Sequence, residues 1–418
     1  MGSSLALAQT CPAPSAIAKG LTLPLAAVRY LADDALAGRL AGSAGERCAG
    51  DYIAGEFRRL GLRPAGAAGT FFQDVPLASV LNPHAAGGTG RNVMAALDGA
   101  NAALKGEWIV VGAHYDHLGE GGSPSSLAPG DRAIHNGADD NASGVAAMLE
   151  VAERLVAAAR PSRSVLFIAF TGEETGLLGS AHFVANPTIG PGVMTAMINM
   201  DMVGRLAGGS LIVSGVDTAD EWRALLDPAA ARAGVTLAMR GEGYGPSDHS
   251  SFYVKDVPVL HFFTNTHGDY HKPSDDWEKI DGPGLEKVAA IVTEVVSAAA
   301  RRPARLTLRR GAGQPPPPPG APSPASSSAY LGSVPDFTPV DRGVKLSGVT
   351  PGSPADQAGL RTGDVVLGIG THDVADLQAM TDALRAYKPG ETVALRFLRG
   401  TETRTIQVTL GSRAAIAR

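Results

Sequence analysis

The chain has 418 residues, of which 44% are hydrophobic, and a formal net charge of −5. This length exceeds that of one ordinary domain, so we expect two domains. The acidic balance, without a basic patch interleaved with aromatic residues, excludes nucleic acid as a partner. No apolar run is long enough to cross a bilayer, so we expect a soluble chain without a membrane span.

Residues 1–24 are expected to form an N-terminal arm. Leu5 to Gln9 resembles the small-residue end of a secretory signal, which favours a secreted or periplasmic protein, although Met1 to Ser4 also fits an artificial extension. The two cysteines, Cys11 and Cys48, can pair in an exported protein. The sequence leaves open whether they form a disulfide or remain free thiols.

Residues 25–303 are predicted to form an α/β domain. Apolar residues recur at helical spacing from about 25 to 60, and short strands are expected at 71–77 and 91–97, with a glycine-rich loop at 83–90 between them. Strands then alternate with helices up to about residue 300. This alternation is typical of a doubly wound sheet with helices on both faces.

Three predicted strands, at 107–114, 164–170 and 194–201, end at or just before residues that can bind a metal ion or a proton: His114 and Asp116, Glu173 and Glu174, and Asp201. Chemistry in open α/β sheets collects outside the carboxyl ends of the strands. We therefore expect these side chains to converge at one edge of the sheet.

The segment Asn136-Gly-Ala-Asp-Asp-Asn-Ala-Ser-Gly144 places two carboxylates just before a predicted helix. One alternative is that an aspartate at this position serves only as a helix cap. The other acids and histidines favour a metal site instead. Zinc accepts imidazole nitrogen and carboxylate oxygen, and two ions about 3.5–4 Å apart can share one carboxylate. Asp139 is the expected bridge in a set of five ligands: His114, Asp139, Glu174, Asp201 and His271.

Six segments resemble the successive motifs of the two-zinc exopeptidases related to bacterial leucyl aminopeptidase and aminopeptidase Y. They are GAHYDHLG at 112–119, NGADDNASG at 136–144, TGEETGLLGS at 171–180, NMDMVG at 199–204, SDH at 247–249 and DYHKPSD at 269–275. The resemblance covers about residues 25–300. It implies a three-layer αβα fold with a mixed, mostly parallel sheet, two zinc ions per chain, and hydrolysis of peptides that have a free N-terminus.

The resemblance also implies roles for single residues. One zinc ion would be held by His114, Asp139 and Asp201, and the other by Asp139, Glu174 and His271. Glu173 would be the general base that takes a proton from water and returns it to the leaving amine. Asp116 would accept a hydrogen bond from His114, and a cis peptide would join Asp139 to Asp140.

Tyr244 matches a family tyrosine that hydrogen-bonds the tetrahedral intermediate, although Gly243 and Gly245 replace the cysteines that flank it in some members. The remaining histidines near the motifs are expected to support the site or its loops: His117, His135, His249 and His267. Loops around Phe252, Phe262 and Phe263 are expected to build the pocket for the substrate side chain.

Residues 304–328 are rich in proline, serine and glycine and contain five consecutive prolines, which predicts a stiff, extended linker. Residues 329–412 are long enough for a small second domain, with strands expected at 344–349, 364–369, 392–398 and 405–410 and a helix at 377–387.

GSPADQAGL at 352–360 and RTGDVVL at 361–367 resemble a bacterial PDZ domain. The resemblance implies that Tyr330, Leu331 and Gly332 hold the C-terminal carboxylate of a peptide ligand, which adds a strand to the sheet edge. A domain that only packs on the peptidase is the alternative.

Three other functions fit parts of this pattern. Glutaminyl cyclases and carboxypeptidases use a similar fold, and a protein without catalytic activity could work through its PDZ domain alone. Glu173 beside a complete ligand set favours catalysis. The sequence therefore predicts an aminopeptidase and leaves its side-chain preference open.

Overall fold

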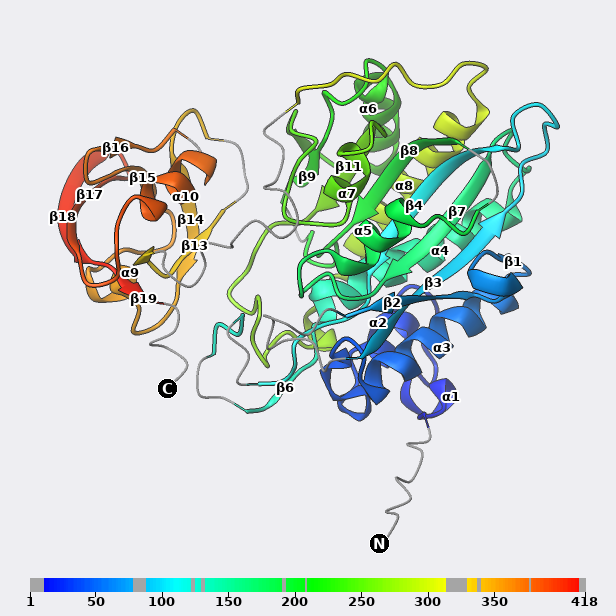
Figure 1. Ribbon diagram of the computed structural model, residues 1–418, viewed down its shortest axis with the longest axis horizontal. Helices are drawn as coiled ribbons and strands as arrows, with labels where there is room; N and C mark the ends of the chain where they lie inside the picture. Colours follow the sequence, from blue (N-terminus) through cyan, green and yellow to red (C-terminus); the bar gives the residue numbers. More distant parts are fainter. Residues whose placement is uncertain are drawn as a thin grey trace, which may run out of the picture.

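The computed structural model describes residues 11–77, 88–121, 125–128, 132–189, 193–206, 209–312, 329–336, 340–375 and 377–412. These residues form a larger α/β domain and a smaller β-rich domain (Figure 1). The signal-like segment at 5–9, the proline run and most of the expected glycine-rich loop lie outside the described residues.

A nine-stranded mixed sheet forms the middle layer of the larger domain, in the order β1-β3-β7-β4-β8-β11-β9-β10, with β2 paired to β3. The central strands β7, β4, β8 and β11 are mutually parallel, whereas β3 and β9 pair antiparallel to their central neighbours. The expected mixed, mostly parallel sheet is thus confirmed. Its strands are β1 (Arg63–Pro64), β2 (Phe72–Pro76), β3 (Thr89–Leu97), β4 (Glu107–His114), β7 (Ser164–Phe170), β8 (Val193–Met200), β9 (Leu211–Ser214), β10 (Leu237–Met239) and β11 (Val259–Phe263).

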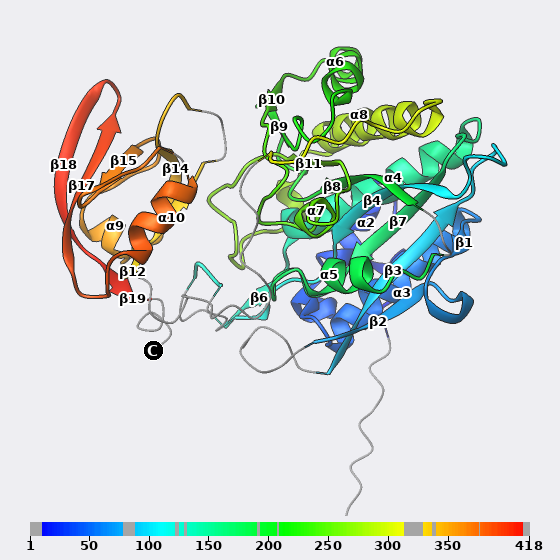
Figure 2. The same ribbon diagram turned by 45° about the horizontal axis from the view of Figure 1, so that its top comes forward.

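Helices cover both faces of this sheet, and α4 and α8 lie side by side (Figure 2). Their bounds are α1 (Pro14–Ile17), α2 (Leu25–Leu31), α3 (Ala44–Arg59), α4 (Gly144–Ala157), α5 (Leu178–Ala185), α6 (Trp222–Ala233), α7 (His249–Tyr253) and α8 (Gly282–Arg301). Short irregular helices are η1 (Asp34–Arg39), η2 (Ala67–Gly69), η3 (Ala138–Ser143) and η4 (Trp277–Lys279), and β5 (Gly119–Glu120) pairs with β6 (Ile134–His135).

Side-chain alternation along β4 explains the three layers. Ile109 and Val111 belong to the hydrophobic cluster that contains α4 and α8, whereas Trp108 and Val110 belong to the cluster on the other face, with Phe183 of α5. Successive side chains of a strand point to opposite faces, so a continuous apolar run buries itself on both sides. The apolar run of β4 is therefore covered on both faces of the sheet.

The N-terminal arm is tied to α3 by a disulfide between Cys11 and Cys48, which settles the pairing that the sequence left open. The two cysteines are 37 residues apart. Closing a loop of that length in the unfolded chain stabilises the native state by about 4 kcal/mol in the chain-entropy description.

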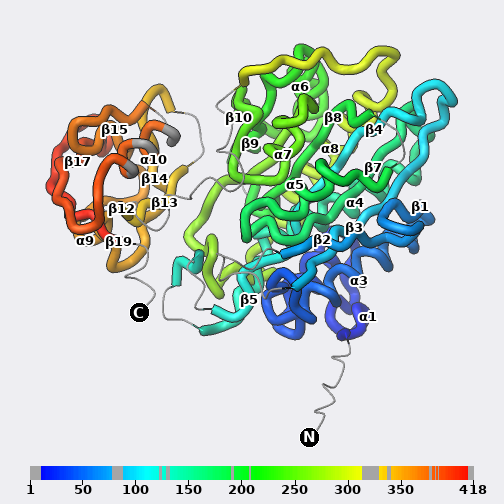
Figure 3. The backbone as a smooth tube through the Cα atoms, in the orientation of Figure 1, coloured from blue at the N-terminus to red at the C-terminus, as the bar shows by residue number. Residues whose placement is uncertain are grey.

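The chain between α8 and the proline run packs on the larger domain, as Figure 3 shows for the segment that follows α8. Arg309 N donates to Thr218 O at 2.8 Å, Ala312 N donates to Tyr253 Oη at 2.9 Å, and Leu306 is buried. Residues 304–312, expected to begin the linker, therefore belong to this domain because their backbone and apolar groups find partners there.

The smaller domain has a six-stranded antiparallel sheet in the order β13-β14-β15-β17-β18, with β16 paired to β15, and a separate pair β12-β19. Leu346, Val366 and Phe397 lie in its core, which confirms the predicted strands. The elements are β12 (Ala329–Tyr330), β13 (Ser333–Pro335), β14 (Val344–Val349), α9 (Pro354–Gln357), β15 (Val365–Ile369), β16 (His372–Asp373), α10 (Leu377–Arg385), β17 (Thr392–Arg399), β18 (Glu402–Thr409) and β19 (Gly411–Ser412).

Among the helices of the described segments, none combines the length and the apolar content that a bilayer span requires.

Candidate metal centre

The carboxyl ends of β4, β7 and β8 meet at one edge of the sheet, where η3 and the loop after β11 join them. His114 is the last residue of β4, Glu173 and Glu174 follow β7, and Asp201 follows β8. His271 comes from the loop after β11. The expected convergence of these side chains is what the structure shows.

The first cluster consists of His114, Asp140 and Asp201, whose ligand atoms lie within 4.8 Å of one another. His114 Nε2 is 3.4 Å from Asp140 Oδ1 and 3.4 Å from Asp201 Oδ1. The three side chains therefore surround one small space.

The second cluster consists of His117, Asp140 and Glu174, whose ligand atoms also lie within 4.8 Å of one another, and it shares Asp140 with the first cluster. His271 Nε2 lies 3.1 Å from Asp140 Oδ2 and 3.4 Å from Glu174 Oε2. His117 Nδ1 lies 2.8 Å from Glu174 Oε1 and 3.9 Å from Asp140 Oδ2. The two oxygens of Asp140 thus face different clusters.

The central carboxylate is therefore Asp140, and the expectation for Asp139 is corrected by one residue. Asp139 Oδ1 accepts a hydrogen bond from Gly204 N at 2.7 Å, and its Oδ2 lies 3.0 Å from His267 Nε2. The cis peptide is also one residue later than expected, between Asp140 and Asn141. Sequence spacing could not separate two adjacent aspartates in an irregular turn.

Long-range contacts hold this turn. Asp275 Oδ2 accepts the amides of Asp139 and Asp140 at 2.9 and 3.0 Å. Asn141 bonds Met200 O through Nδ2 at 3.0 Å and accepts Met202 N at 3.1 Å, which joins the turn to the end of β8. These contacts decide which aspartate faces the clusters.

Gly137 begins the turn with a positive φ of 53°. A Cβ atom there would lie 2.1 Å from Asp140 O and 2.5 Å from His117 Cδ2. The close approach of His117 to the turn therefore requires glycine.

Arg39 binds the backbone just before this turn, and nothing in the sequence pattern indicated that role. Its buried guanidinium donates to Tyr115 O at 2.8 Å, Asn136 O at 2.7 Å and Gly137 O at 3.0 Å, and also to Leu31 O. Burial lowers the pKa of Arg39 to about 10 despite the nearby carboxylates of Asp140 and Asp116. It stays charged at neutral pH and fastens η1 to the loop before η3.

His117 was expected in a supporting or loop position, and the structure brings it into direct contact with Glu174. Its ring is fully buried, and its Nε2 has no hydrogen-bond partner among the described residues. The HxxH spacing from His114 to His117 is the sequence signal that could have indicated this.

The adjacent glutamates have opposite electrostatic surroundings. Burial, together with the charges of Glu174 and Asp201, raises the pKa of Glu173 well above its usual value against the opposing effect of His114. Burial also opposes ionisation of Glu174, but His271 and His117 lower the pKa of Glu174 to about 2. Two neighbouring carboxyl groups with divergent pKa values are typical of separate acid/base and ligand roles.

Asp116 lies where expected beside His114, but its backbone makes the closer contact. His114 Nδ1 is 3.2 Å from Asp116 O and 3.8 Å from its Oδ1. The carboxylate instead accepts the amide of Glu173 at 3.1 Å. Asp116 therefore orients both the first histidine and the first glutamate.

Tyr244 packs against Tyr253, with ring centroids 4.7 Å apart, and burial together with Tyr253 and Asp256 raises the pKa of Tyr244. A second tyrosine, Tyr270, lies at the clusters. Its ring stacks on that of His271 with a centroid distance of 3.9 Å. Burial and the charges of Asp140 and Glu174 raise the pKa of Tyr270 well above 10.

The other expected residues lie in supporting or core positions. His135 bonds Ser126 Oγ at 2.8 Å, and His249 stacks on His261 at 4.4 Å inside the domain. Phe252 and Phe262 are fully buried in the core and Phe263 is nearly so. Phe252 and Phe262 are enclosed in the two core clusters that cover the sheet, whereas Phe263 packs with Met202 and Ile212 in a small cluster against which Tyr270 lies.

The donor set fits zinc. Tetrahedral zinc with ligands at 2.0–2.2 Å separates neighbouring ligand atoms by about 3.4 Å, and the histidine-to-carboxylate distances to Asp140 are 3.4 and 3.1 Å. Four carboxylates gather at the clusters: Asp140, Glu173, Glu174 and Asp201. In the described part of the chain, each ion pair that they form is made to a histidine. Buried carboxylates that have no lysine or arginine partner are typically paired with a metal ion.

Residues 92–296 match the model of peptidase family M28, and residues 331–410 match that of the PDZ domain. A probable leucine aminopeptidase from Arthroderma otae is 31% identical over 199 residues, which are 44% of this chain and 52% of that protein. The match thus spans about half the length of this curated relative.

Two solved structures are similar in fold. BSAP, a zinc aminopeptidase from Bacillus subtilis, aligns with a TM-score of 0.52 at 21% identity, covering 67% of this chain and 95% of that one. Porphyromonas gingivalis glutaminyl cyclase aligns with a TM-score of 0.53 at 20% identity, covering 66% and 96%.

The larger domain is thus a metallopeptidase domain with the zinc exopeptidase fold. The match over residues 92–296 places this domain in peptidase family M28, and the chain carries a C-terminal PDZ domain.

Proposed function

We propose that this protein is an aminopeptidase that removes N-terminal residues from peptides and uses two zinc ions per chain. The observation that carries the proposal is the position of Asp140, whose two oxygens face two histidine-containing clusters. The aminopeptidases among its relatives and structural neighbours support the choice of the N-terminal end of the substrate.

His114, Asp140 and Asp201 would hold one ion. The other would lie between Asp140, Glu174 and His271, and His117, which groups with the same two carboxylates, would offer a further imidazole there. Zinc at such a site lowers the pKa of a water molecule and polarises a peptide carbonyl.

Glu173 performs the proton transfers in this proposal. Its Oε2 lies 4.0 Å from His114 Nε2, and it belongs to neither ligand trio. Because its surroundings raise its pKa, Glu173 accepts a proton from water readily and returns it to the leaving amine. Tyr270, protonated at neutral pH, donates a hydrogen bond to the oxygen on which negative charge develops.

A panel of aminoacyl p-nitroanilides tests the proposal. We expect cleavage that stops with a chelator and returns with zinc. Mass spectrometry of one peptide with an N-terminal glutamine separates the alternatives: loss of the first residue indicates an aminopeptidase, pyroglutamate formation with one zinc per chain a cyclase, and loss of the last residue a carboxypeptidase. Bound zinc without turnover would indicate a binding protein.

We further propose that Tyr330, Leu331 and Gly332 bind the C-terminus of a peptide ligand. Leu331 O and Gly332 O accept the amides of Ala355 and Thr350, each at 2.8 Å, so the carbonyls of this loop are held inside the PDZ domain. Calorimetric titration with peptides that carry a free or an amidated C-terminus tests the assignment.

We also propose a secreted or periplasmic location. The Cys11–Cys48 disulfide supports it, because such bonds persist in oxidising compartments. Thiol labelling of acid-quenched cells should find both cysteines blocked, and labelled thiols would contradict this location.

A further inference from the structure

The PDZ domain contacts the loop that supplies His271. Thr266 Oγ1 donates to Pro335 O at 2.7 Å and lies 2.8 Å from Ser347 Oγ. The preceding residue, Asn265, donates through Nδ2 to Asp336 Oδ1 at 2.7 Å. The contact between the domains is thus made beside the candidate metal centre.

This contact uses the outer face of β14. Val344 and Leu346 point into the core of the PDZ domain, whereas the intervening Lys345 pairs with Asp336 at 2.9 Å and Ser347 meets the peptidase domain. Alternate strand residues point to opposite faces. The PDZ domain therefore keeps its own core intact and offers a polar face to the peptidase.

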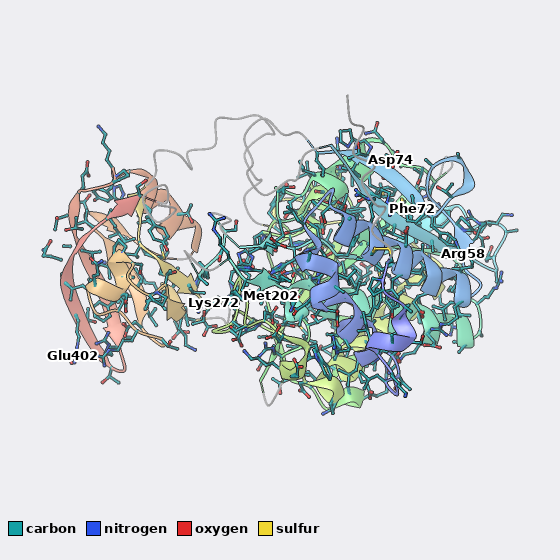
Figure 4. The ribbon with its side chains drawn as sticks, turned by 90° about the horizontal axis from the view of Figure 1, so that it is seen from below. Arg58, Phe72, Asp74, Met202, Lys272 and Glu402 are labelled. Atoms are coloured by element: carbon teal, nitrogen blue, oxygen red, sulfur yellow. A yellow bond between two sulfur atoms is a disulfide. The ribbon has the colours of Figure 1, made fainter. Side chains whose placement is uncertain are left out.

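A cavity of about 390 Å³ lies between the two domains. His267, Tyr270 and Lys272 line it from the peptidase, and Ser347, Val349 and Arg361 from the PDZ domain. Figure 4 shows Lys272 on the side of the peptidase domain that faces the PDZ domain. None of the lining residues belongs to the loop from Tyr330 to Gly332, so this is a separate site.

The cavity borders the second cluster. Tyr270, which lines it, stacks on His271 with a centroid distance of 3.9 Å. Leu127, also in the lining, donates its amide to His271 O at 2.9 Å, and His267 Nε2 lies 3.0 Å from Asp139 Oδ2.

Two cations of the lining are available to an anion. Lys272 Nζ bonds only a carbonyl, Gly268 O, at 2.7 Å, and neither Lys272 nor Arg361 forms an ion pair within the described residues. The acid in the lining, Asp356 of α9, accepts the amide of Gly352 at 2.8 Å, just before the N-cap residue Ser353. A carboxylate in this cavity would find charge-assisted donors on both walls.

We propose that this interdomain cavity binds the C-terminal carboxylate of a short peptide substrate whose N-terminal residue lies at the metal centre. The PDZ domain then selects substrates by length and by their free C-terminus. This inference rests on the proposed aminopeptidase function. An extended peptide spans about 3.3–3.6 Å per residue, so the preference should be greatest at one peptide length.

The test compares kcat/KM for leucine-initiated peptides of two to six residues, each with a free or an amidated C-terminus. At the optimal length we expect the wild-type protein to prefer the free acid by about tenfold, the value of one charge-assisted hydrogen bond. Arg361→Gln should lower this ratio towards one, mainly through KM. Lys388→Gln removes one charge from an exposed loop of the same domain outside the cavity and should keep the ratio.

Calorimetry in a Glu173→Gln background gives the same comparison as dissociation constants without turnover. A ratio of one at every length, or a ratio that Arg361→Gln leaves unchanged, would overturn the inference. The p-nitroanilide assay reports separately on the proposed function, because those substrates have no C-terminal carboxylate.

Discussion

Asp275 accepts the backbone amide of Asp140 at 3.0 Å, so the last of the six family-like motifs along the chain holds the turn that presents the central carboxylate. Asp275 is 0% exposed and also pairs with Arg205 at 3.1 Å. A buried carboxylate with two amides and one guanidinium as partners fixes the backbone of the turn.

Replacing Asp275 by alanine should therefore weaken zinc binding by about 10–100-fold, the usual effect of removing a partner that orients a ligand. Competition with a chromophoric chelator measures this affinity. Asp275→Asn keeps one acceptor and should lie between the wild type and alanine, which protects the test if the alanine variant fails to fold. The exposed Asp74, labelled in Figure 4, provides the control Asp74→Ala. Unchanged affinity in both Asp275 variants would refute the positioning role.

The two adjacent glutamates should separate metal binding from catalysis. Glu173→Gln should retain both zinc ions and lose about 10²–10⁴-fold in kcat, because it removes only the proton acceptor. Glu174→Gln should lose zinc, since Glu174 belongs to the second cluster. Elemental analysis with kinetics on the same samples makes the comparison, and loss of zinc from the Glu173 variant would contradict the assignment.

The two tyrosines offer a matched pair. Tyr270→Phe should lower kcat by about 10²–10³-fold, the effect of losing one donor to the developing oxyanion. Tyr244→Phe should change kcat little, because that ring packs on Tyr253. The reverse result would return the role to Tyr244.

Glu46 should make stability depend on pH. It lies buried on α3, accepts the amide of Gly42 at 2.8 Å and a hydrogen bond from the Thr171 hydroxyl, and burial raises the pKa of Glu46 from 4.5 to about 7. Because the folded pKa is above the unfolded value, the neutral acid contributes stability that is complete below pH 4.5 and is lost as pH rises through 7.

A shift of this size corresponds to roughly 3 kcal/mol between the two ends of that window. Glu46→Gln, which mimics the neutral acid, should flatten this part of the profile. The difference in urea unfolding free energy between wild type and variant at pH 5 and pH 8 isolates the effect, since the other titrating groups are common to both proteins. If the unfolding free energies of the wild type and Glu46→Gln changed equally between pH 5 and pH 8, Glu46 would ionise normally in the folded protein.

The structure confirms the features that depend on short stretches of sequence. The strands ending at His114 and Phe170, and the one leading to Asp201, followed from apolar runs, and the two domains followed from motifs and the proline run. Apolar periodicity and the position of a side chain at a strand end depend on neighbouring residues, so these features and the PDZ strands could be predicted.

By itself, then, the sequence determined the fold class, the family motifs and the strand ends that carry most of the site. Only the tertiary structure decided that Asp140 and not Asp139 lies between the clusters, that His117 reaches Glu174, and that Tyr270 stacks on His271. The reason is physical: in irregular turns and loops the direction of a side chain is set by backbone angles, and contacts from distant residues such as Asp275 fix those angles.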